Sequence, residues 1–270
     1  MEHTLVIDTS YGSTVGIVGH EPIVETDSRT HVERLQGNIA RVMSDAGLGP
    51  ADLDEIVVGV GPAPFTGLRA GIVVAKALAF ATGARLVGHD VLGPQAQWNL
   101  IRRSRADALG DPKACHVLTL AVNDARRKQL YFALYDNPLD RVGGGETGAR
   151  PLIEMDIDYP QSIVERVNEA VRAYASGKDG DIVVDVIGHG AAKYADILRR
   201  IERIGDVDDA SVLDQGAQGL AIFASDAVIA HAHDSRMSVE PLYLRRPDAE
   251  IPNPLKHVLG HGAAGKAGER

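Results

Sequence analysis

The apolar and polar positions in the first third of the chain predict one folding unit. Short apolar runs separated by turn residues indicate strands, and apolar residues spaced three and four apart indicate helices. The first helix is expected to begin at a capping box formed by Thr30 and Glu33, and to end at Gly47. In order, the unit has three strands, a helix, a strand, a helix and a fifth strand, at residues 4–10, 14–18, 22–29, 31–46, 56–60, 66–82 and 84–88.

The pattern then starts again. A helix at 91–106 and a Gly-Pro linker are followed by strands, helix, strand and helix at 115–122, 129–135, 151–155, 160–174, 182–187 and 191–204. The sequence therefore predicts an α/β fold of two β-β-β-α-β-α units. We expect residues 1–108 with a returning helix at 215–235 to form the first domain, and 112–214 the second. Residues 253–270 are rich in Gly, Ala and Lys, which predicts a disordered tail.

The helix predicted at residues 66–82 is apolar on nearly every face. Only Arg69 and Lys76 carry charge in it. A surface helix normally shows a single apolar stripe, so this one needs cover on two sides. Its own sheet supplies one side, and a second helix, from this chain or another, must supply the other. Gly67, Gly71 and Ala75 form a smooth ridge for close helix approach, which packing inside the domain explains equally well.

Composition narrows the class of protein. The net charge is −9, whereas nucleic-acid binders usually carry a basic surface. The chain is therefore not expected to bind RNA without a partner. The single cysteine, Cys115, excludes an internal disulfide and is expected to be a small buried apolar residue in a reducing compartment. No signal peptide is evident, and no run is expected to reach the roughly 18 apolar residues that cross a membrane. The expectation is a cytoplasmic protein.

At this point the residues resemble a known family. Residues 58–88 are similar to the Gly-Pro-Gly-Ser-Phe-Thr-Gly-Leu-Arg segment of TsaB (YeaZ) proteins, which take part in threonylcarbamoyladenosine synthesis in tRNA. Three further pieces agree in family order: Asp8-Thr9-Ser10, Asp124-Ala125-Arg126-Arg127 followed by Tyr131, and Pro241-Leu242-Tyr243-Leu244-Arg245. The resemblance implies an actin-like, RNase H-like fold with two mixed five-stranded sheets flanked by helices. It also implies kinship with TsaD in the actin-like ATPase (glycoprotease-like) superfamily.

The resemblance implies a function without catalysis by this chain. TsaB-like proteins pair with TsaD, which transfers a threonylcarbamoyl group to the adenosine beside the anticodon, and the ATPase TsaE joins them. Threonylcarbamoyl-adenylate, ATP and a metal would then belong to partner subunits, so no cofactor is expected here. tRNA would be bound through the complex, and no membrane is expected to take part. Alone, the chain is expected to form a homodimer through the same apolar patch.

The partner contact is expected on the helices at 31–46 and 66–82, as a bundle with the matching pair of TsaD. The apolar residues of this surface are the candidate anchors, and two basic residues lie among them. The candidates are Leu35, Ile39, Gly67, Leu68, Arg69, Ile72, Ala75 and Lys76. His31, at the start of the first helix, is interpreted as a surface or interface residue.

The metal and nucleotide positions of the superfamily are poorly filled in this chain. Where TsaD-like proteins have two histidine ligands, the chain has Val91 and Gln95, and His89 nearby is alone. Asp8, Ser10 and Gly12 in the first hairpin are the candidates for a nucleotide or Mg²⁺. In the second turn Ala63 and Pro64 replace the usual Gly and Ser, which limits positive φ and removes an N–H group.

Several alternatives stay open. Gly188-His189-Gly190 could contact an adenosine or simply begin a helix, and Arg126 with Arg127 could contact tRNA, an acidic partner or only solvent. Neither Gly-x-Ser-x-Gly nor His-Glu-x-x-His occurs. The alternatives to a pairing subunit are an actin-like ATPase or small-molecule kinase, and a glycoprotease-like peptidase.

Overall fold

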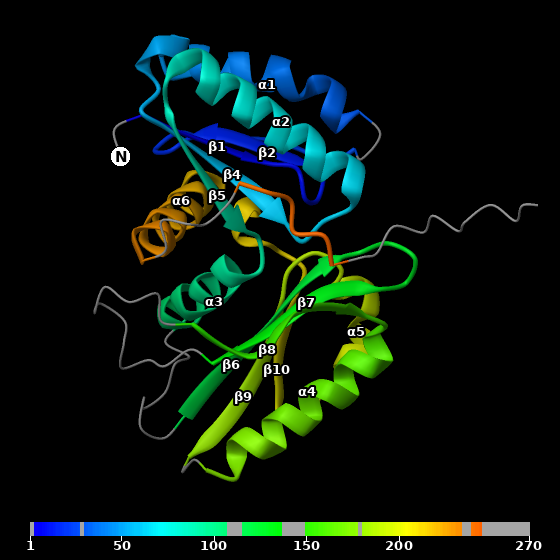
Figure 1. Ribbon diagram of the computed structural model, residues 1–270. Coiled ribbons are helices and arrows are strands. Elements are labelled where there is room, and N and C mark those ends of the chain that lie inside the picture. Colours follow the sequence, from blue (N-terminus) through cyan, green and yellow to red (C-terminus); the bar gives the residue numbers. More distant parts are fainter. Residues whose placement is uncertain are drawn as a thin grey trace, which may run out of the picture.

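The computed structural model describes residues 3–27, 30–106, 115–136, 149–177, 180–233 and 239–244, and each of its two lobes contains one five-stranded sheet (Figure 1). The first sheet has the strand order β3-β2-β1-β4-β5. β1 is antiparallel to β2 and parallel to β4, so the sheet is mixed. Its strands are β1 (Thr4–Asp8), β2 (Ser13–Ile17), β3 (Ile23–Glu25), β4 (Glu55–Gly61) and β5 (Arg85–Asp90).

The second sheet repeats this plan. Its order is β10-β9-β6-β7-β8, and β6 is antiparallel to β7 and parallel to β9, as β1 is to β2 and β4. Its strands are β6 (Cys115–Asp124), β7 (Leu130–Asp136), β8 (Arg150–Asp158), β9 (Asp181–Ile187) and β10 (Ile204–Asp208). The predicted α/β fold of two such units with mixed five-stranded sheets is confirmed.

Helices cover the outer faces of both sheets and fill the space between the lobes (Figure 1). α1 (His31–Asp45) and α2 (Phe65–Thr82) lie on the outer face of the first sheet, and α4 (Pro160–Ala175) with α5 (Ala195–Leu198) on that of the second. α3 (Gly93–Arg105) and α6 (Gly216–His233) lie between the sheets. α6 contacts β1, β2 and β5, while α3 contacts β6, β7 and β9. The described residues also include the short 3-10 turns η1 (Pro50–Asp52), η3 (Ala192–Tyr194) and η4 (Val212–Asp214).

The first sheet is buried on both faces, and its strands show this directly. Successive side chains of a strand point to opposite faces. On β1, Leu5 and Ile7 belong to the core beneath α1 and α2, whereas Val6 belongs to the core around α6, which includes Leu220 and Phe223. All three β1 side chains are fully buried. The continuous apolar runs of the sequence therefore reflect two cores, one on each side of the sheet.

The structure corrects the predicted start of α1. Thr30 is the N-cap residue, but its hydroxyl makes no capping hydrogen bond, because its backbone (φ −117°, ψ −13°) is helical rather than extended. The predicted capping box is therefore wrong. The end at Gly47 is confirmed, since its φ of +70° is left-handed and the amide of Leu48 donates to the carbonyl of Met43 at 2.9 Å.

The helix predicted at 191–204 is also wrong. The chain forms η3 and the short α5, and then turns into β10, which the sequence analysis missed. Arg203 makes this turn in a left-handed conformation, and Ile204 pairs with Val184 of β9. Cys115 is half-buried instead of fully buried.

Two expectations are not tested by the fold. The predicted tail at 253–270 lies outside the described residues. The division into domains 1–108 with 215–235 and 112–214 stays a prediction, although α6 does pack on the strands of the first sheet.

Candidate functional site

Five of the predicted partner contacts lie inside this chain. Their side chains are buried between α1, α2 and the first sheet: Leu35, Ile39, Leu68, Ile72 and Ala75. Their apolar area is already covered in the single chain, so another protein would meet different residues. Because α2 is apolar all round, helical spacing alone did not show which of its faces meets the sheet.

The ridge of small residues on α2 serves the same internal packing. A Cβ atom on Gly71 would lie 2.3 Å from the hydroxyl oxygen of Thr9, just beyond β1. Glycine therefore lets α2 approach the end of β1 closely. Gly67 is half-buried.

The outer face of α2 carries an apolar stripe that nothing in the described chain fully covers. Phe65, Val73 and Phe80 are 50%, 62% and 93% exposed. Their spacing of seven and eight residues places them on one side of the helix. Of the six large apolar side chains exposed in the described residues, three belong to this stripe, which marks a surface suited to another protein.

The apolar character of α2 bears on the expectation about membranes. Its 18 residues have a mean hydropathy of 1.4, so this single helix is long and apolar enough, by length and composition alone, to cross a membrane. Arg69 and Lys76 interrupt it, so it is not an unbroken apolar run of that length. Leu68 and Ile72 pack the helix on the first sheet, and we interpret it as a surface helix with one uncovered face.

A groove between α1 and α2 borders the stripe. The walls combine apolar side chains with a few polar ones, among them Glu33 on α1 and Arg69 on α2. A groove between two helices can take the side-chain ridge of another helix. The lining residues are Val32, Glu33, Leu35, Gln36, Thr66, Arg69, Ala70, Val73 and Val74.

The segment 239–244, here called the strap, crosses the first lobe and contacts α2 through the two predicted basic residues. Lys76 forms an ion pair with Glu240 at 2.8 Å, and Nε of Arg69 donates to the hydroxyl of Tyr243 at 2.6 Å. The amide of Leu242 donates to the carbonyl of Val60 at 2.8 Å, which ties the strap to β4. Sequence reasoning missed this contact. The signal was two isolated cations in an otherwise apolar helix.

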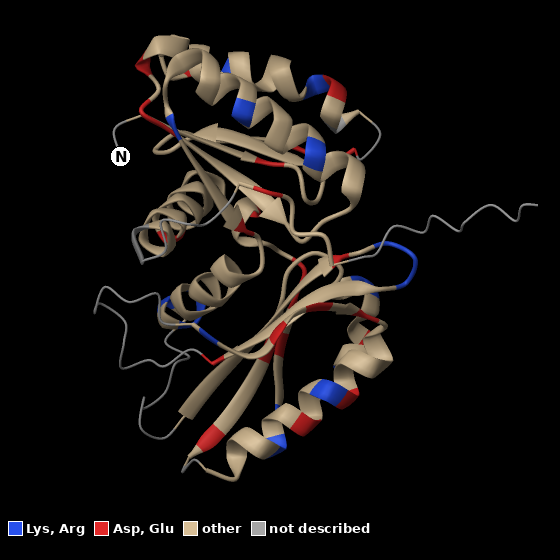
Figure 2. Ribbon diagram, viewed as in Figure 1, with Lys and Arg blue, Asp and Glu red and all other residues tan. Residues whose placement is uncertain are grey.

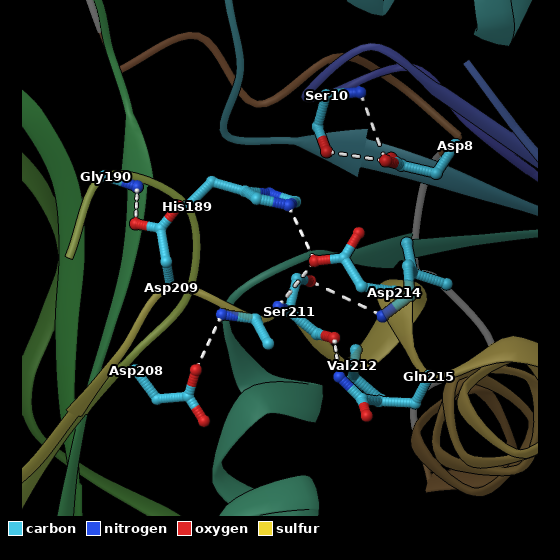
Figure 3. A network of polar contacts seen from close by, with 12 residues as sticks. Asp8, Ser10, His189, Gly190, Asp208, Asp209, Ser211, Val212, Asp214 and Gln215 are labelled. Carbon is cyan, nitrogen blue, oxygen red and sulfur yellow. Dashed lines mark hydrogen bonds and ion pairs between the residues drawn. The ribbon is translucent and has the colours of Figure 1, made fainter. Parts of the chain in front are cut away.

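The cleft between the lobes holds two of the nucleotide candidates, Asp8 and Ser10 (Figure 3). Asp8 ends β1 and is 4% exposed. Its Oδ2 accepts hydrogen bonds from the Ser10 hydroxyl at 2.7 Å and the Ser10 amide at 3.2 Å. Burial raises the pKa of Asp8 although these hydrogen bonds and the nearby His189 oppose the rise. Asp8 and Ser10 thus lie together, and these hydrogen bonds join the two residues to each other.

The packing of the first hairpin explains why residue 12 is a glycine. Its φ is +69°, and a Cβ atom there would lie 2.2 Å from the carbonyl oxygen of Glu25 on β3. Glycine is therefore required to pair the hairpin with β3. It does not join Asp8 and Ser10 in a common pocket lining.

Side chains from both lobes close the cleft. Tyr11 of the first hairpin stacks on His189 of the second lobe with ring centres 4.0 Å apart, and His189 contacts Asp214 at 2.8 Å. The remaining cavity beside Asp8 has a volume of about 10 Å³, the space of about one water molecule. A nucleotide could enter only after these contacts open.

The positions that correspond to metal ligands are used for other contacts. Val91 is buried, and Gln95 joins α3 to η4, donating to the Ser211 hydroxyl at 2.7 Å and accepting from the Val212 amide at 2.9 Å. His89 contacts Asp226 at 3.0 Å. Within the described ranges, no three His, Cys, Asp or Glu side chains gather as a metal site.

The two remaining turns are also explained by packing. Gly188 has a φ of +119°, and a Cβ atom on it would lie 2.2 Å from the carbonyl oxygen of Val122. The Gly190 amide donates to Asp209 at 2.9 Å, just before η3. Ala63 is buried, and Pro64 caps the start of α2 with an extended backbone. The side chain of His31 lies outside the described part of the chain.

The structure has two mixed five-stranded sheets, with helices between and outside them and a closed central cleft. This architecture defines an actin-like α/β protein of two lobes. YeaZ from Pseudomonas aeruginosa has a similar fold, with a TM-score of 0.60, 23% identity and coverage of 90% of this chain and all of that one. The model of the family described as TsaD: tRNA N6-adenosine threonylcarbamoyltransferase matches residues 19–253, and the chain belongs to this family.

Relatives by sequence agree with the resemblance to TsaB (YeaZ) proteins, which is confirmed. The tRNA threonylcarbamoyladenosine biosynthesis protein TsaB of Escherichia coli K12 is 25% identical over 222 residues, which cover 80% of this chain and 81% of that protein. An uncharacterized protein of Mycobacterium tuberculosis is 39% identical over 149 residues, or 52% of this chain. That match spans 62% of the mycobacterial protein, so the chain covers less than two thirds of this relative's length.

Proposed function

We propose that the chain is a non-catalytic subunit that pairs with a TsaD protein in forming threonylcarbamoyladenosine beside the anticodon of tRNA. Membership of the family and similarity to Escherichia coli TsaB support this role. The observation that carries the proposal is the exposed apolar stripe of α2, where Phe80 is 93% exposed. TsaE would join the pair, tRNA would be bound by the complex, and the assembly would work in the cytoplasm.

The pairing surface consists of the outer face of α2 and its groove with α1. Val73 and Phe80 supply apolar area at the centre, Phe65 lies at the edge beside the strap, and the polar residues Glu33 and Gln36 line the groove. Interfaces commonly combine an apolar centre with a polar rim. Without its partner, the chain would cover the same surface with a second copy, which is the homodimer predicted from the sequence.

The closed cleft supports a subunit without chemistry of its own. Tyr11 and His189 stack across it, and the cavity beside Asp8 holds about 10 Å³. Isothermal titration calorimetry with ATP and Mg²⁺ separates this proposal from an actin-like ATPase or kinase. Micromolar binding by the isolated chain would favour the enzyme. Mass spectrometry of TsaD incubated with the chain tests the peptidase, because intact TsaD excludes it.

The deciding experiment reconstitutes the reaction with TsaD and TsaE from the same organism, tRNA and threonylcarbamoyl-adenylate. We expect the chain to raise the rate of product formation and to capture TsaD in a pull-down. The double variant Val73→Ser/Phe80→Ser should lose both effects. Tyr159→Ser, whose side chain is 56% exposed in the second lobe, is the matched control and should keep them. If TsaD works equally fast with and without the chain, the proposal fails.

A further inference from the structure

The turn between β6 and β7 has an unusual backbone. Arg126, Arg127 and Lys128 have φ angles of 63°, 51° and 64°, so three successive residues occupy the left-handed region. Residues other than Gly and Asn seldom adopt this left-handed conformation, because the Cβ atom crowds the backbone. Glycine would adopt the turn at the lowest cost. The chain instead keeps three basic side chains here.

The turn is held in one shape by its neighbours. Ala125 is fully buried at its base. The amide of Gln129 donates to the carbonyl of Arg126 at 3.0 Å, and the amide of Ala125 donates to the carbonyl of Gln129 at 3.1 Å. The amide of Arg126 donates to Oδ1 of Asp124 at 2.9 Å. The basic side chains therefore project from a fixed hairpin tip.

The exposed charges at this hairpin tip are positive. The buried carboxylate of Asp124 faces both Lys193, at 3.1 Å, and Arg126, at 3.9 Å. Arg127 and Lys128, which follow Arg126 in the turn, are exposed, so the tip carries three exposed cations in a row. The guanidinium of Arg126 lies 5.6 Å from the ring centre of Tyr11, the residue that stacks across the cleft. In Figure 2 the ribbon of this turn is coloured as an unbroken stretch of Lys and Arg, in a chain whose net charge is −9.

We infer that Arg126, Arg127 and Lys128 bind the phosphate backbone of RNA. The inference rests on the proposed function, in which the RNA is the tRNA held by the complex. Arginine donates paired hydrogen bonds to phosphate oxygens, and contacts of this kind fix position without reading sequence. The phosphate groups of RNA repeat along its backbone, so neighbouring phosphates can each contact one of the cations held side by side at the hairpin tip. The acidic chain would bind RNA poorly alone, so the contact would act once the partner has bound the tRNA.

The test changes the charge while it preserves the turn. Arg127→Asn/Lys128→Asn keeps the left-handed backbone, because Asn tolerates positive φ. Arg199→Asn/Arg200→Asn is the control, since it removes two exposed cations elsewhere in the same lobe. Fluorescence anisotropy would follow labelled tRNA binding to the complex of each variant with TsaD over a series of KCl concentrations. Size-exclusion chromatography would confirm that each complex forms.

We expect the Arg127/Lys128 variant to bind tRNA at least about threefold more weakly at low salt. The slope of log affinity against log salt should become shallower by about 1 to 2. The control should bind as the wild type does. Unchanged affinity and slope would overturn the inference, as would an equal loss in the control. Loss of TsaD pairing instead would indicate an acidic protein partner and also overturn it. If the wild-type chain never pairs with TsaD, the proposed function fails; if it pairs and the Arg127/Lys128 variant binds tRNA as the wild type does, the inference alone fails.

Discussion

Arg69 and Tyr243 are 174 residues apart in the chain, yet Nε of Arg69 donates a hydrogen bond to the Tyr243 hydroxyl at 2.6 Å. The guanidinium carbon of Arg69 also lies 3.9 Å from the ring centre of Phe65, and the Phe65 ring stacks on that of Tyr243. The strap therefore covers the first turn of α2 and leaves Val73 and Phe80 beyond it. In this way the C-terminal segment sets the limit of the surface that we assign to the partner.

Removal of the Tyr243 contacts should loosen the strap in two steps. Tyr243→Phe removes one exposed hydrogen bond and should lower the free energy of unfolding by less than about 1 kcal/mol. Tyr243→Ala also removes the ring stack and should lower it by about 0.5–1.5 kcal/mol more. Urea unfolding measures both, with Tyr159→Phe in the other lobe as the control. An unchanged urea midpoint for Tyr243→Ala would show that the strap is not fixed in solution.

Two glycines in neighbouring helices should respond oppositely to alanine. At Gly71 the new methyl group would meet the Thr9 side chain at 2.3 Å, so Gly71→Ala should destabilise the fold by about 1–3 kcal/mol. At Gly37 on α1 a Cβ atom would have nothing within 4 Å, so Gly37→Ala should stabilise by about 0.5–1 kcal/mol. Thermal and urea unfolding measure the pair. Equal effects of the same sign would refute the close contact between α2 and Thr9.

The order of the elements could be predicted because each is marked by local pattern. Apolar runs such as 56–60 and 182–187 end at Gly-rich turns, and they form the interior strands β4 and β9. β10 was missed because Ile204–Asp208 has two aspartates and no long apolar run. Its place depends on pairing with β9, a contact that local spacing does not record.

The candidate site was harder to predict because α2 has two apolar faces. Helical spacing grouped Leu68, Ile72 and Ala75 correctly, but only the position of the sheet shows that this group points inward. The contact of Arg69 with Tyr243 joins distant parts of the sequence and leaves no local pattern. The closing of the cleft by Tyr11 and His189 likewise depends on how the two lobes meet.

The buried pair of His89 and Asp226 should make stability fall as pH rises. Burial of the ring opposes its charge, but the hydrogen bond with Asp226, and the charges of Asp90 and Asp226, raise the pKa of His89 above 6.5. The folded state then holds this proton more tightly than the unfolded state. The contribution is fully present below about pH 6.5, and is lost as pH passes through the raised pKa.

This dependence can be isolated by comparing variants. The free energy of unfolding of wild type minus that of His89→Gln should decrease between pH 5.5 and pH 8.5, by about 1.4 kcal/mol for each unit by which the pKa is raised. Asp226→Asn should reduce the decrease, because it removes the partner that favours the charged ring. A difference that stays constant with pH would contradict the raised pKa.

Asp185 on β9 joins α3 to the second sheet and should be the most costly carboxylate to neutralise. Its side chain is fully buried and accepts hydrogen bonds from Nη2 of Arg103 at 2.6 Å and from Asn99 at 2.9 Å. Asp185→Asn leaves the Arg103 charge without its partner, so we expect a loss of about 3–5 kcal/mol in urea unfolding. Asp206→Asn is the control. It removes a carboxylate that is 60% exposed and pairs with Arg102 at 2.9 Å, so its loss should stay below about 1 kcal/mol.

The contribution of Asp185 should also disappear in acid. Burial opposes ionisation, but hydrogen bonds from Arg103, the Asp206 amide and Asn99 outweigh it and lower the pKa of Asp185 below its usual 3.8. The unfolded state therefore binds this proton more readily than the folded state, so the stabilisation is present above about pH 4 and is lost as pH falls through the lowered pKa. The advantage of wild type over Asp185→Asn should be constant from pH 5 to pH 8 and shrink below pH 4. An advantage that already shrinks between pH 8 and pH 5 would mean that the carboxylate is not held ionised by Arg103, and that α3 is fixed to the second sheet by other contacts.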